Sequence, residues 1–456
     1  MSILKFESML KTNDVYFFDA VEFETIIEHY LNIAKHSLAK KAVQLSLEQH
    51  PTSIQLKLMK VEILIFENKL EEAVKMLRDI EAVEPHNDEV FIQKALILSK
   101  KKQHVEAIVV LKESLEFIED PADIWSMLGM EYLYLDDFEN ARVNFEKCVE
   151  EDYEDYSSLY NIVYCFDMQE KHVEAIRFLN AYVDKNPYCE VAWHQLGKQY
   201  SELGMHKEAL TSFDYSVLID ESFIGGYLEK AKTLEELNNY EEAINNYLIT
   251  LELDDPTAFA YIRIGKCYEK LENMHTAIHF YKKAVHEDPL LDKAWMLLAN
   301  AYYNDGNFQK ALHYVNKAIE IDEINELYWK RSGDINLKLN FYEEAVKSFY
   351  TSIELGEQGL DVYTALADIL LFLGDFEDAL KIIIKAKKIY KESAEVEYRL
   401  CGLFMILDKE DYSLTHLKNA LEIDYEYHSI IKELYPSVYE NKHIQQILLS
   451  YKKAIK

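Results

Sequence analysis

Residues 257–291 read TAFAYIRIGKCYEKLENMHTAIHFYKKAVHEDPLL, and this stretch predicts two short helices joined by a turn. Apolar and small residues follow the i, i+3, i+4 spacing of one helix face in each half: Tyr261, Ile264, Gly265 and Tyr268, then Ala277, Ile278, Tyr281, Ala284 and Val285. Gly265 and Ala277 are small enough to predict a close approach of the two helix backbones. Pro289 lacks the N–H that a helix needs and ends the second helix.

The same pattern returns every 34 residues without an insertion. Counting from Ala277 in steps of 34 reaches ten further alanines: Ala39, Ala73, Ala107, Ala141, Ala175, Ala209, Ala243, Ala311, Ala345 and Ala379. The last step reaches Ser413 instead. Eleven alanines in one register do not arise by chance, so the chain is an array of about twelve copies of one unit.

Two further registers accompany the alanines. Sixteen residues before each alanine the slot is mostly aromatic, and it holds all four tryptophans of the chain, Trp125, Trp193, Trp295 and Trp329. Twelve residues before the alanine the slot is small in eight units, with Gly129, Gly197, Gly265, Gly333, Ala95, Ala231, Ala299 and Ala367. These registers predict which faces of the helices are buried.

The aromatic, the Gly or Ala, the alanine and the closing Pro together resemble the tetratricopeptide repeat, a helix–turn–helix unit of 34 residues. The resemblance covers residues 20–427 as twelve tandem repeats, numbered 1 to 12 below. It implies an all-α fold, namely a right-handed superhelical α-solenoid that forms one domain. We expect the flanking residues 1–19 and 428–456 to cap the two ends of the array.

Charge and cysteine usage limit the possible partners and compartments. The 456 residues carry 49 Lys and Arg against 81 Asp and Glu, a net charge of −32, which disfavours direct nucleic-acid binding and favours basic protein surfaces. Alternatively, the acidic residues only form a solvated outer face and bind no partner. The five cysteines lack CxxC pairs, which indicates buried side chains in a reducing compartment. Because we find neither a signal-peptide pattern nor a membrane-length apolar run, we expect a cytoplasmic protein.

Known catalytic patterns are missing from the sequence. It contains no GxxxxGK[ST] phosphate loop, no GxSxG, no HExxH and no Cys/His set at zinc spacing. His104, His172 and His206 share one slot between the two helices, which predicts exposed turn residues. The repeats and their flanks use the whole chain, so we expect no enzyme activity, no cofactor and no metal.

The resemblance also implies which side chains meet a ligand. In tetratricopeptide arrays the first helix of each repeat lines the concave side of the superhelix through its second, fifth, sixth, ninth, twelfth and thirteenth residues. On this chain these inner positions form an apolar section in repeats 2 to 5 and a basic section in repeats 6 to 10. The expected contact residues are Met127, Met130, Tyr134, Tyr160 and Tyr164 in the apolar section, and Arg263, Lys266, Lys270, Lys293, Asn300, Lys330 and Arg331 in the basic section.

Each section has two interpretations. The apolar section is either a groove for an apolar or amphipathic partner segment, or packing against the next turn of a tight superhelix. The basic section either binds an acidic peptide, a terminal carboxylate or a phosphate, with Asn300 holding a peptide backbone, or pairs with acids such as Glu269 and Asp334.

We therefore expect a non-catalytic scaffold or adaptor that binds a peptide or helix of a partner protein in the concave groove. The alternative is an acidic assembly factor that docks on a basic partner of the translation or another nucleic-acid-associated machinery, without binding nucleic acid or inserting into a membrane. The effect of salt distinguishes the two, because outer-face binding by charge weakens as ionic strength rises and groove binding by apolar anchors persists.

Overall fold

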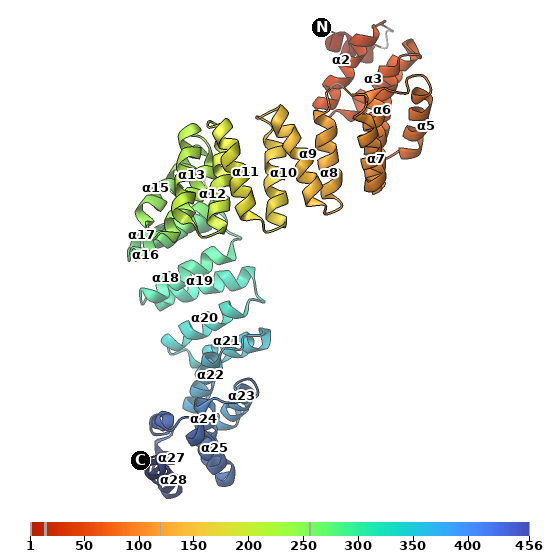
Figure 1. Cartoon of the computed structure of the whole chain (residues 1–456). Helices are drawn as coiled ribbons and strands as arrows, with labels where there is room; N and C mark the ends of the chain where they lie inside the picture. Colours follow the sequence, from red (N-terminus) through yellow and green to blue (C-terminus); the bar gives the residue numbers. More distant parts are fainter. Residues whose placement is uncertain (1, 13–15, 119, 255–256, 456) are drawn as a thin grey trace. The chain divides into compact units, whose positions relative to one another are not determined.

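The computed structural model describes residues 2–12, 16–118, 120–254 and 257–455. These residues form 28 α-helices and one short 3-10 helix, and no strand occurs among them. The helices group into two compact parts, Met1–Gly226, here called the N-terminal part, and Tyr227–Lys456, the C-terminal part. Figure 1 shows a succession of paired helices in each part.

The helices of the N-terminal part are α1 (Ser2–Thr12), α2 (Ala20–Asn32), α3 (His36–Gln49), α4 (Ile54–Phe66), α5 (Leu70–Glu81), α6 (Asp88–Lys100), α7 (His104–Ser114), α8 (Ala122–Leu133), α9 (Phe138–Glu151), α10 (Tyr156–Met168), α11 (His172–Lys185), α12 (Glu190–Glu202) and α13 (His206–Ile219). The boundary between the parts falls inside α14 (Ile224–Glu236). The helices of the C-terminal part are α15 (Tyr240–Leu253), α16 (Ala258–Lys270), α17 (Met274–Glu287), α18 (Asp292–Asn304), α19 (Phe308–Ile321), α20 (Glu326–Lys338), α21 (Tyr342–Leu355), α22 (Leu360–Leu373), α23 (Phe376–Ile389), α24 (Ala394–Ile406), α25 (Glu410–Ile423), η1 (Glu426–His428), α26 (Ser429–Leu434), α27 (Pro436–Tyr439) and α28 (Lys442–Ile455).

Each predicted repeat is a pair of helices, from α2 with α3 in repeat 1 to α24 with α25 in repeat 12. Within each part, the second helix of a repeat also packs on the first helix of the next, as α9 does on α10 and α23 on α24. All eleven register alanines and Ser413 are buried with an exposed fraction of 0%, so this slot forms the centre of every pair. The predicted all-α solenoid is confirmed, whereas the hand of its superhelix stays a prediction.

The glycine register makes a different contact from the predicted one. We expected a close approach of two backbones at Gly265, but the ring of Tyr281, sixteen residues later, fills the space, and a Cβ atom on Gly265 would lie 2.4 Å from it. Three more glycines meet a phenylalanine in the same way: Gly129 with Phe145, Gly197 with Phe213 and Gly333 with Phe349. The glycine thus admits a large side chain of the second helix, because a ring and a β-carbon cannot share that volume.

Other repeats divide the same space differently. In most repeats whose slot holds a larger residue, the side chain sixteen positions later is aliphatic, as in Ile27 with Val43, Val61 with Leu77, Val163 with Leu179 and Ala299 with Val315. Repeat 7 combines Ala231 with Tyr247, whose hydroxyl donates a hydrogen bond to Glu235 at 2.6 Å.

The turn between the two helices contains a left-handed residue in every repeat, five positions before the register alanine or Ser413. Three of these residues are Gly204, Gly306 and Gly374. The other nine have φ between 54° and 60°: Ala34, Asn68, Lys102, Asp136, Glu170, Asn238, Glu272, Asn340 and Asp408. Asn, Asp and Gly tolerate this conformation best, and their frequency at this slot is the sequence signal for the turn.

We expect Glu170→Gly to stabilise repeat 5 by about 0.5–1 kcal/mol, because a β-carbon is strained at φ 54° and glycine is not. Hydrogen exchange of peptides from α10 and α11, measured by mass spectrometry, should slow. The control Glu174→Gly lies inside α11 and should cost about 1 kcal/mol. Equal effects of the two substitutions would contradict strain at Glu170.

The segments outside the register pack on the terminal repeats. Phe6 of α1 is fully buried, with its ring 6.5 Å from that of Phe23 in α2. At the other end, Pro436 is the first residue of the short helix α27, where its missing N–H costs nothing. Ile444 and Leu448 of α28 are buried. These contacts are consistent with capping segments, and the capping role stays a prediction.

Candidate interaction surface

The expected apolar section maps to α8 and α10 of the N-terminal part. Met127 and Met130 are half-buried and pack on the hydrophobic core. Tyr134, Tyr160 and Tyr164 expose 57%, 43% and 48% of their surface. The methionines therefore contribute to packing, whereas the three tyrosines offer side chains that a partner can reach.

One face of α10 is both apolar and open. Tyr160, Tyr164 and Met168 follow one another at i, i+4 and i+8, which places them along one stripe of the helix. All three are exposed, whereas Leu159 and Ile162 of the same helix are fully buried. Core packing accounts for the second group only, so the stripe favours the groove interpretation at these residues.

His104 corrects the expectation of exposed turn histidines. It opens α7, and only 17% of its side chain is exposed. Its Nδ1 atom lies 2.8 Å from Oε2 of Glu131 in the next repeat, and its ring centroid lies 4.9 Å from that of Tyr134. His172 reaches across the repeats in the same way, to Oε1 of Gln199 at 3.0 Å. The slot is covered because it faces the first helix of the following repeat.

Arg263 of the basic section is held inside the C-terminal part. Its Nη2 atom lies 2.8 Å from Oε1 of Glu235, and its Nε donates to that oxygen at 2.9 Å. The Tyr247 hydroxyl lies 3.2 Å from Nε, and burial together with the Glu235 carboxylate raises the pKa of Tyr247. The Arg263 guanidinium is therefore already paired with a carboxylate of the same chain, that of Glu235.

Lys330 and Arg331 also follow the ion-pair interpretation. The Lys330 ammonium lies 2.8 Å from Oδ2 of Asp361, in the next repeat. Arg331 has Nη1 3.6 Å from Asp334, and its guanidinium lies 4.9 Å from the ring centroid of Tyr303. An acidic ligand would have to compete with these carboxylates for either cation.

Three lysines of the basic section remain available, and Asn300 keeps a buried atom without a partner. Lys266, Lys270 and Lys293 are exposed, and none of them has an ion pair within the part of the chain that the structure describes. Asn300 is half-buried, and its Oδ1 atom accepts no hydrogen bond from the described residues. These four residues lie on α16 and α18, the first helices of repeats 8 and 9.

The inner positions of repeat 12 are occupied by the chain itself. Gly402 is the ninth residue of α24, and a Cβ atom there would lie 2.3 Å from the ring of Tyr435. Arg399, the sixth residue, is only 5% exposed and pairs with Asp368 and Glu395. A partner that follows the first helices is therefore excluded from this repeat while Tyr435 stays in place.

The cysteines are unsuited to nucleophilic chemistry. All five are buried, and burial raises the pKa of Cys165 to about 11 and that of Cys267 to about 12, so these thiols stay protonated at neutral pH. Across the described ranges, no three His, Cys, Asp or Glu side chains come together as metal ligands would. No helix formed by those residues combines the length and apolarity needed to cross a bilayer.

Four segments match the tetratricopeptide repeat family, residues 122–155, 260–289, 292–325 and 360–393. They coincide with repeats 4, 8, 9 and 11 of the 34-residue register, and the remaining repeats have the same helix pair and buried slot. The chain is a tetratricopeptide-repeat protein. Tetratricopeptide-repeat proteins bind other proteins, so this chain is, in that general sense, a scaffold for protein interaction.

Solved structures of other tetratricopeptide-repeat proteins are similar to this chain at low identity. The crystal structure of YrrB, described as having an unusual peptide-binding site, is 17% identical and covers 39% of this chain and 92% of its own, with a TM-score of 0.34. The C-terminal part of a repeat protein from Cytophaga hutchinsonii is 19% identical over 51% of this chain and 95% of its own, with a TM-score of 0.45. A chain of the APC/C hetero-tetramer Cut9–Hcn1 is 13% identical over 88% and 92%, with a TM-score of 0.36. No curated protein matches the sequence.

Proposed function

We propose that this tetratricopeptide-repeat protein is a non-catalytic adaptor that binds an extended or helical segment of a partner protein along the inner positions of its first helices. The open stripe of Tyr160, Tyr164 and Met168 on α10 carries the proposal. Burying apolar surface of this kind contributes about 25 cal/mol per Å², and a partner segment is the means of burying it.

The chemistry of the stripe defines the partner. Tyrosine combines a flat apolar ring with a hydroxyl that donates or accepts a hydrogen bond, and it anchors many protein interfaces. Tyr134, the residue that follows α8, adds a third exposed ring to the same section. The partner segment should therefore present apolar or aromatic side chains together with polar backbone groups, as an amphipathic helix or an extended peptide does.

The C-terminal part offers a second contact region of different character. Lys266, Lys270 and Lys293 supply unpaired ammonium groups. Asn300 has a buried Oδ1 atom without a hydrogen-bond partner among the described residues, and this atom would have to become exposed to hold a peptide backbone. We infer an acidic peptide, a terminal carboxylate or a phosphate as the ligand there, because charge-assisted hydrogen bonds favour such groups. Arg263, Lys330 and Arg331 support this region through their ion pairs rather than as free donors.

Photo-crosslinking tests the apolar section directly. We expect p-benzoylphenylalanine in place of Tyr160 to crosslink one defined protein in the native cell, because this side chain is exposed on the stripe. The control places the same amino acid at Val143 of α9, which is 41% exposed but belongs to a second helix. A further Tyr164→Glu substitution should abolish the Tyr160 crosslink without changing the melting temperature. Identical products from both sites would rule out the stripe as the docking face.

The acidic-adaptor alternative rests on the net charge of −32. Part of this charge has a structural role, because acidic pairs open five second helices and stabilise their N-terminal dipoles: Glu71 with Glu72, Glu241 with Glu242, Glu343 with Glu344, Glu377 with Asp378 and Glu410 with Asp411. Affinity purification at two salt concentrations separates the two proposals. A basic partner held by the outer face should dissociate at the higher salt, and a partner held by apolar anchors should remain bound.

A cytoplasmic location is part of either proposal, since the buried free thiols suit a reducing compartment.

A further inference from the structure

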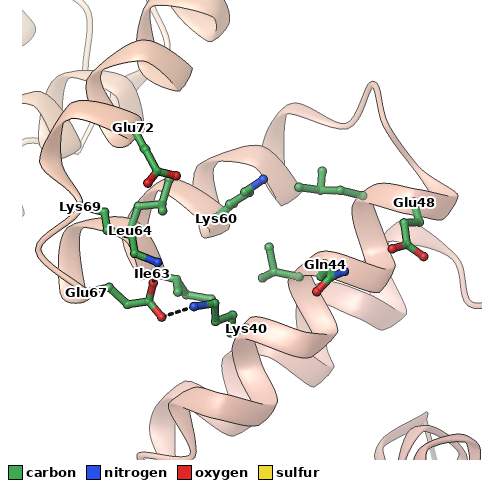
Figure 2. A pocket seen from close by; sticks show the side chains of 11 residues that line it. Lys40, Gln44, Glu48, Lys60, Ile63, Leu64, Glu67, Lys69 and Glu72 are labelled. Carbon is green, nitrogen blue, oxygen red and sulfur yellow. Dashed lines mark hydrogen bonds and ion pairs between the residues drawn. The ribbon is translucent and has the colours of Figure 1, made fainter.

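Two cavities in the N-terminal part lie one repeat apart. The first, of about 430 Å³, is lined by α3, α4 and the start of α5, and Figure 2 shows its lining with Lys60 in the middle. The second, of about 340 Å³, is lined by α5, α6 and α7. Nine residues of the second lining are the 34-residue counterparts of the first: Val74, Leu77, Arg78, Glu81, Lys94, Ile97, Leu98, Lys101 and Gln103. The cavities are therefore copies of one site in repeats 2 and 3.

Each cavity is lined by a lysine at the seventh position of the first helix. Five repeats bury a leucine there, Leu128, Leu196, Leu298, Leu366 and Leu400, with at most 1% exposed. Lys60 and Lys94 take this position in repeats 2 and 3. An ammonium group cannot be buried as a leucine is, so the second helix of the preceding repeat does not close over it. The space that results lies away from the inner face, because Lys60, Ile63 and Leu64 occupy positions 7, 10 and 11 of α4.

The two lysines differ in their partners. Lys94 forms an ion pair with Glu81 and lies 5.9 Å from the centre of the Phe91 ring. The counterpart of Glu81 in the first cavity is Leu47, and within the described residues Lys60 has neither an ion pair nor a hydrogen bond. Lys60 is thus a half-buried cation, and the position that supplies an acid to Lys94 holds a leucine in its case.

The remaining charges differ between the two linings. In the first cavity Lys40 and Lys69 neutralise Glu67 at 2.5 Å and 2.7 Å, the former pair being drawn in Figure 2. Glu48 and Glu72 stand exposed on this lining, so its three lysines face three glutamates. The second lining has Arg78, Lys94 and Lys101 against Glu81 alone, and Lys101 pairs with Glu71 outside the lining at 3.0 Å. Residues 35–103 carry twelve Lys and Arg against ten Asp and Glu, in a chain whose net charge is −32. The segment is therefore close to neutral, with a surplus of two positive charges, in a strongly acidic chain.

We propose that the paired cavities are a second docking site, separate from the inner face, for an acidic amphipathic segment of a partner protein. Apolar side chains of the segment enter the cavities, where Val43, Ile63 and Leu64 line the first and Leu77, Ile97 and Leu98 the second. Its carboxylates pair with Lys60 and with the exposed Arg78, whose planar guanidinium suits bidentate binding. The site would select a segment by both its charge and its apolar shape, whereas a single exposed lysine would select by charge alone.

Filling the cavities tests the proposal in the full-length protein. Lys60→Leu with Lys94→Leu restores the residue that other repeats bury, so the double variant should melt at or above the wild-type temperature. Random twelve-residue peptides displayed on phage are selected on the wild-type protein, and we expect enriched sequences that combine Asp or Glu with large apolar residues. The double variant should bind the best of these synthetic peptides at least ten-fold more weakly by fluorescence anisotropy.

The matched control is Lys75→Leu with Lys100→Leu, which removes the same charge from exposed residues outside both cavities. It should change peptide affinity less than two-fold. Three results would each overturn the site: no enriched peptide on the wild-type protein, enriched peptides without acidic residues, or equal loss of affinity in the filled and control variants.

Discussion

Gly129→Val should destabilise repeat 4 by about 3 kcal/mol, because the new side chain and the Phe145 ring require the same volume. A Cβ atom alone would lie 2.6 Å from that ring, and Phe145 is fully buried. Repeats stack on their neighbours rather than on one shared core, so the effect should be strongest in α8 and α9. Hydrogen exchange of peptides from these two helices, followed by mass spectrometry, measures the local opening free energy.

A second substitution should restore most of the loss. Gly129→Val with Phe145→Leu copies the buried pair Val163 and Leu179 of repeat 5, in which a larger first residue meets a smaller second one. Phe145→Leu alone leaves a cavity over Gly129 and should cost about 1–2 kcal/mol, so the double variant should be more stable than Gly129→Val by itself. Ser126→Val on the same helix controls for the helix propensity of valine. Additive losses in the double variant would show that the ring is not what excludes the valine.

Glu397→Gln should destabilise repeat 12 by about 2 kcal/mol at pH 7, because it removes a buried carboxylate that contacts both Lys387 and His416. Glu397 takes the aromatic slot of its repeat and is 1% exposed. It forms an ion pair with Lys387 of α23, and its Oε2 atom lies 2.5 Å from Nδ1 of His416 in α25. The departure from the repeat pattern is therefore a charged contact that joins three helices.

The loss should depend on pH in a defined direction. Burial by itself would raise the pKa of Glu397, but hydrogen bonds from His416 and Lys387 outweigh burial and hold the pKa below its ordinary value of 4.5. A lowered pKa means that the carboxylate stabilises the fold fully above pH 4.5 and that this contribution is lost as the pH falls through the folded pKa. The melting temperatures of wild type and Glu397→Gln should therefore converge in acid. Glu422→Gln, on the exposed side of α25, should show no such convergence.

Local spacing predicted the repeats well because helix packing is periodic. One alanine every 34 residues located each helix pair, and the structure buries every one of these alanines. The sequence also contains a signal for the left-handed turn, since Asn, Asp or Gly occupies that position in most repeats. The candidate site was harder to predict. The first-helix positions identified Tyr160 and Tyr164, but they could not show that Arg263 binds Glu235 while Lys266 remains exposed.

The sequence by itself determined the all-α repeat, its period and its buried slots, because these follow from 3.6-residue helices that must bury one face against equivalent neighbours. Only the tertiary structure decided which side chains meet across helices. Tyr281 lies over Gly265, Lys330 binds Asp361 of the next repeat, and Lys60 stands in an open cavity where other repeats bury a leucine. Those contacts depend on the volume and charge of side chains that lie on different helices, often in different repeats. The spacing of residues along one helix does not show which of these side chains meet.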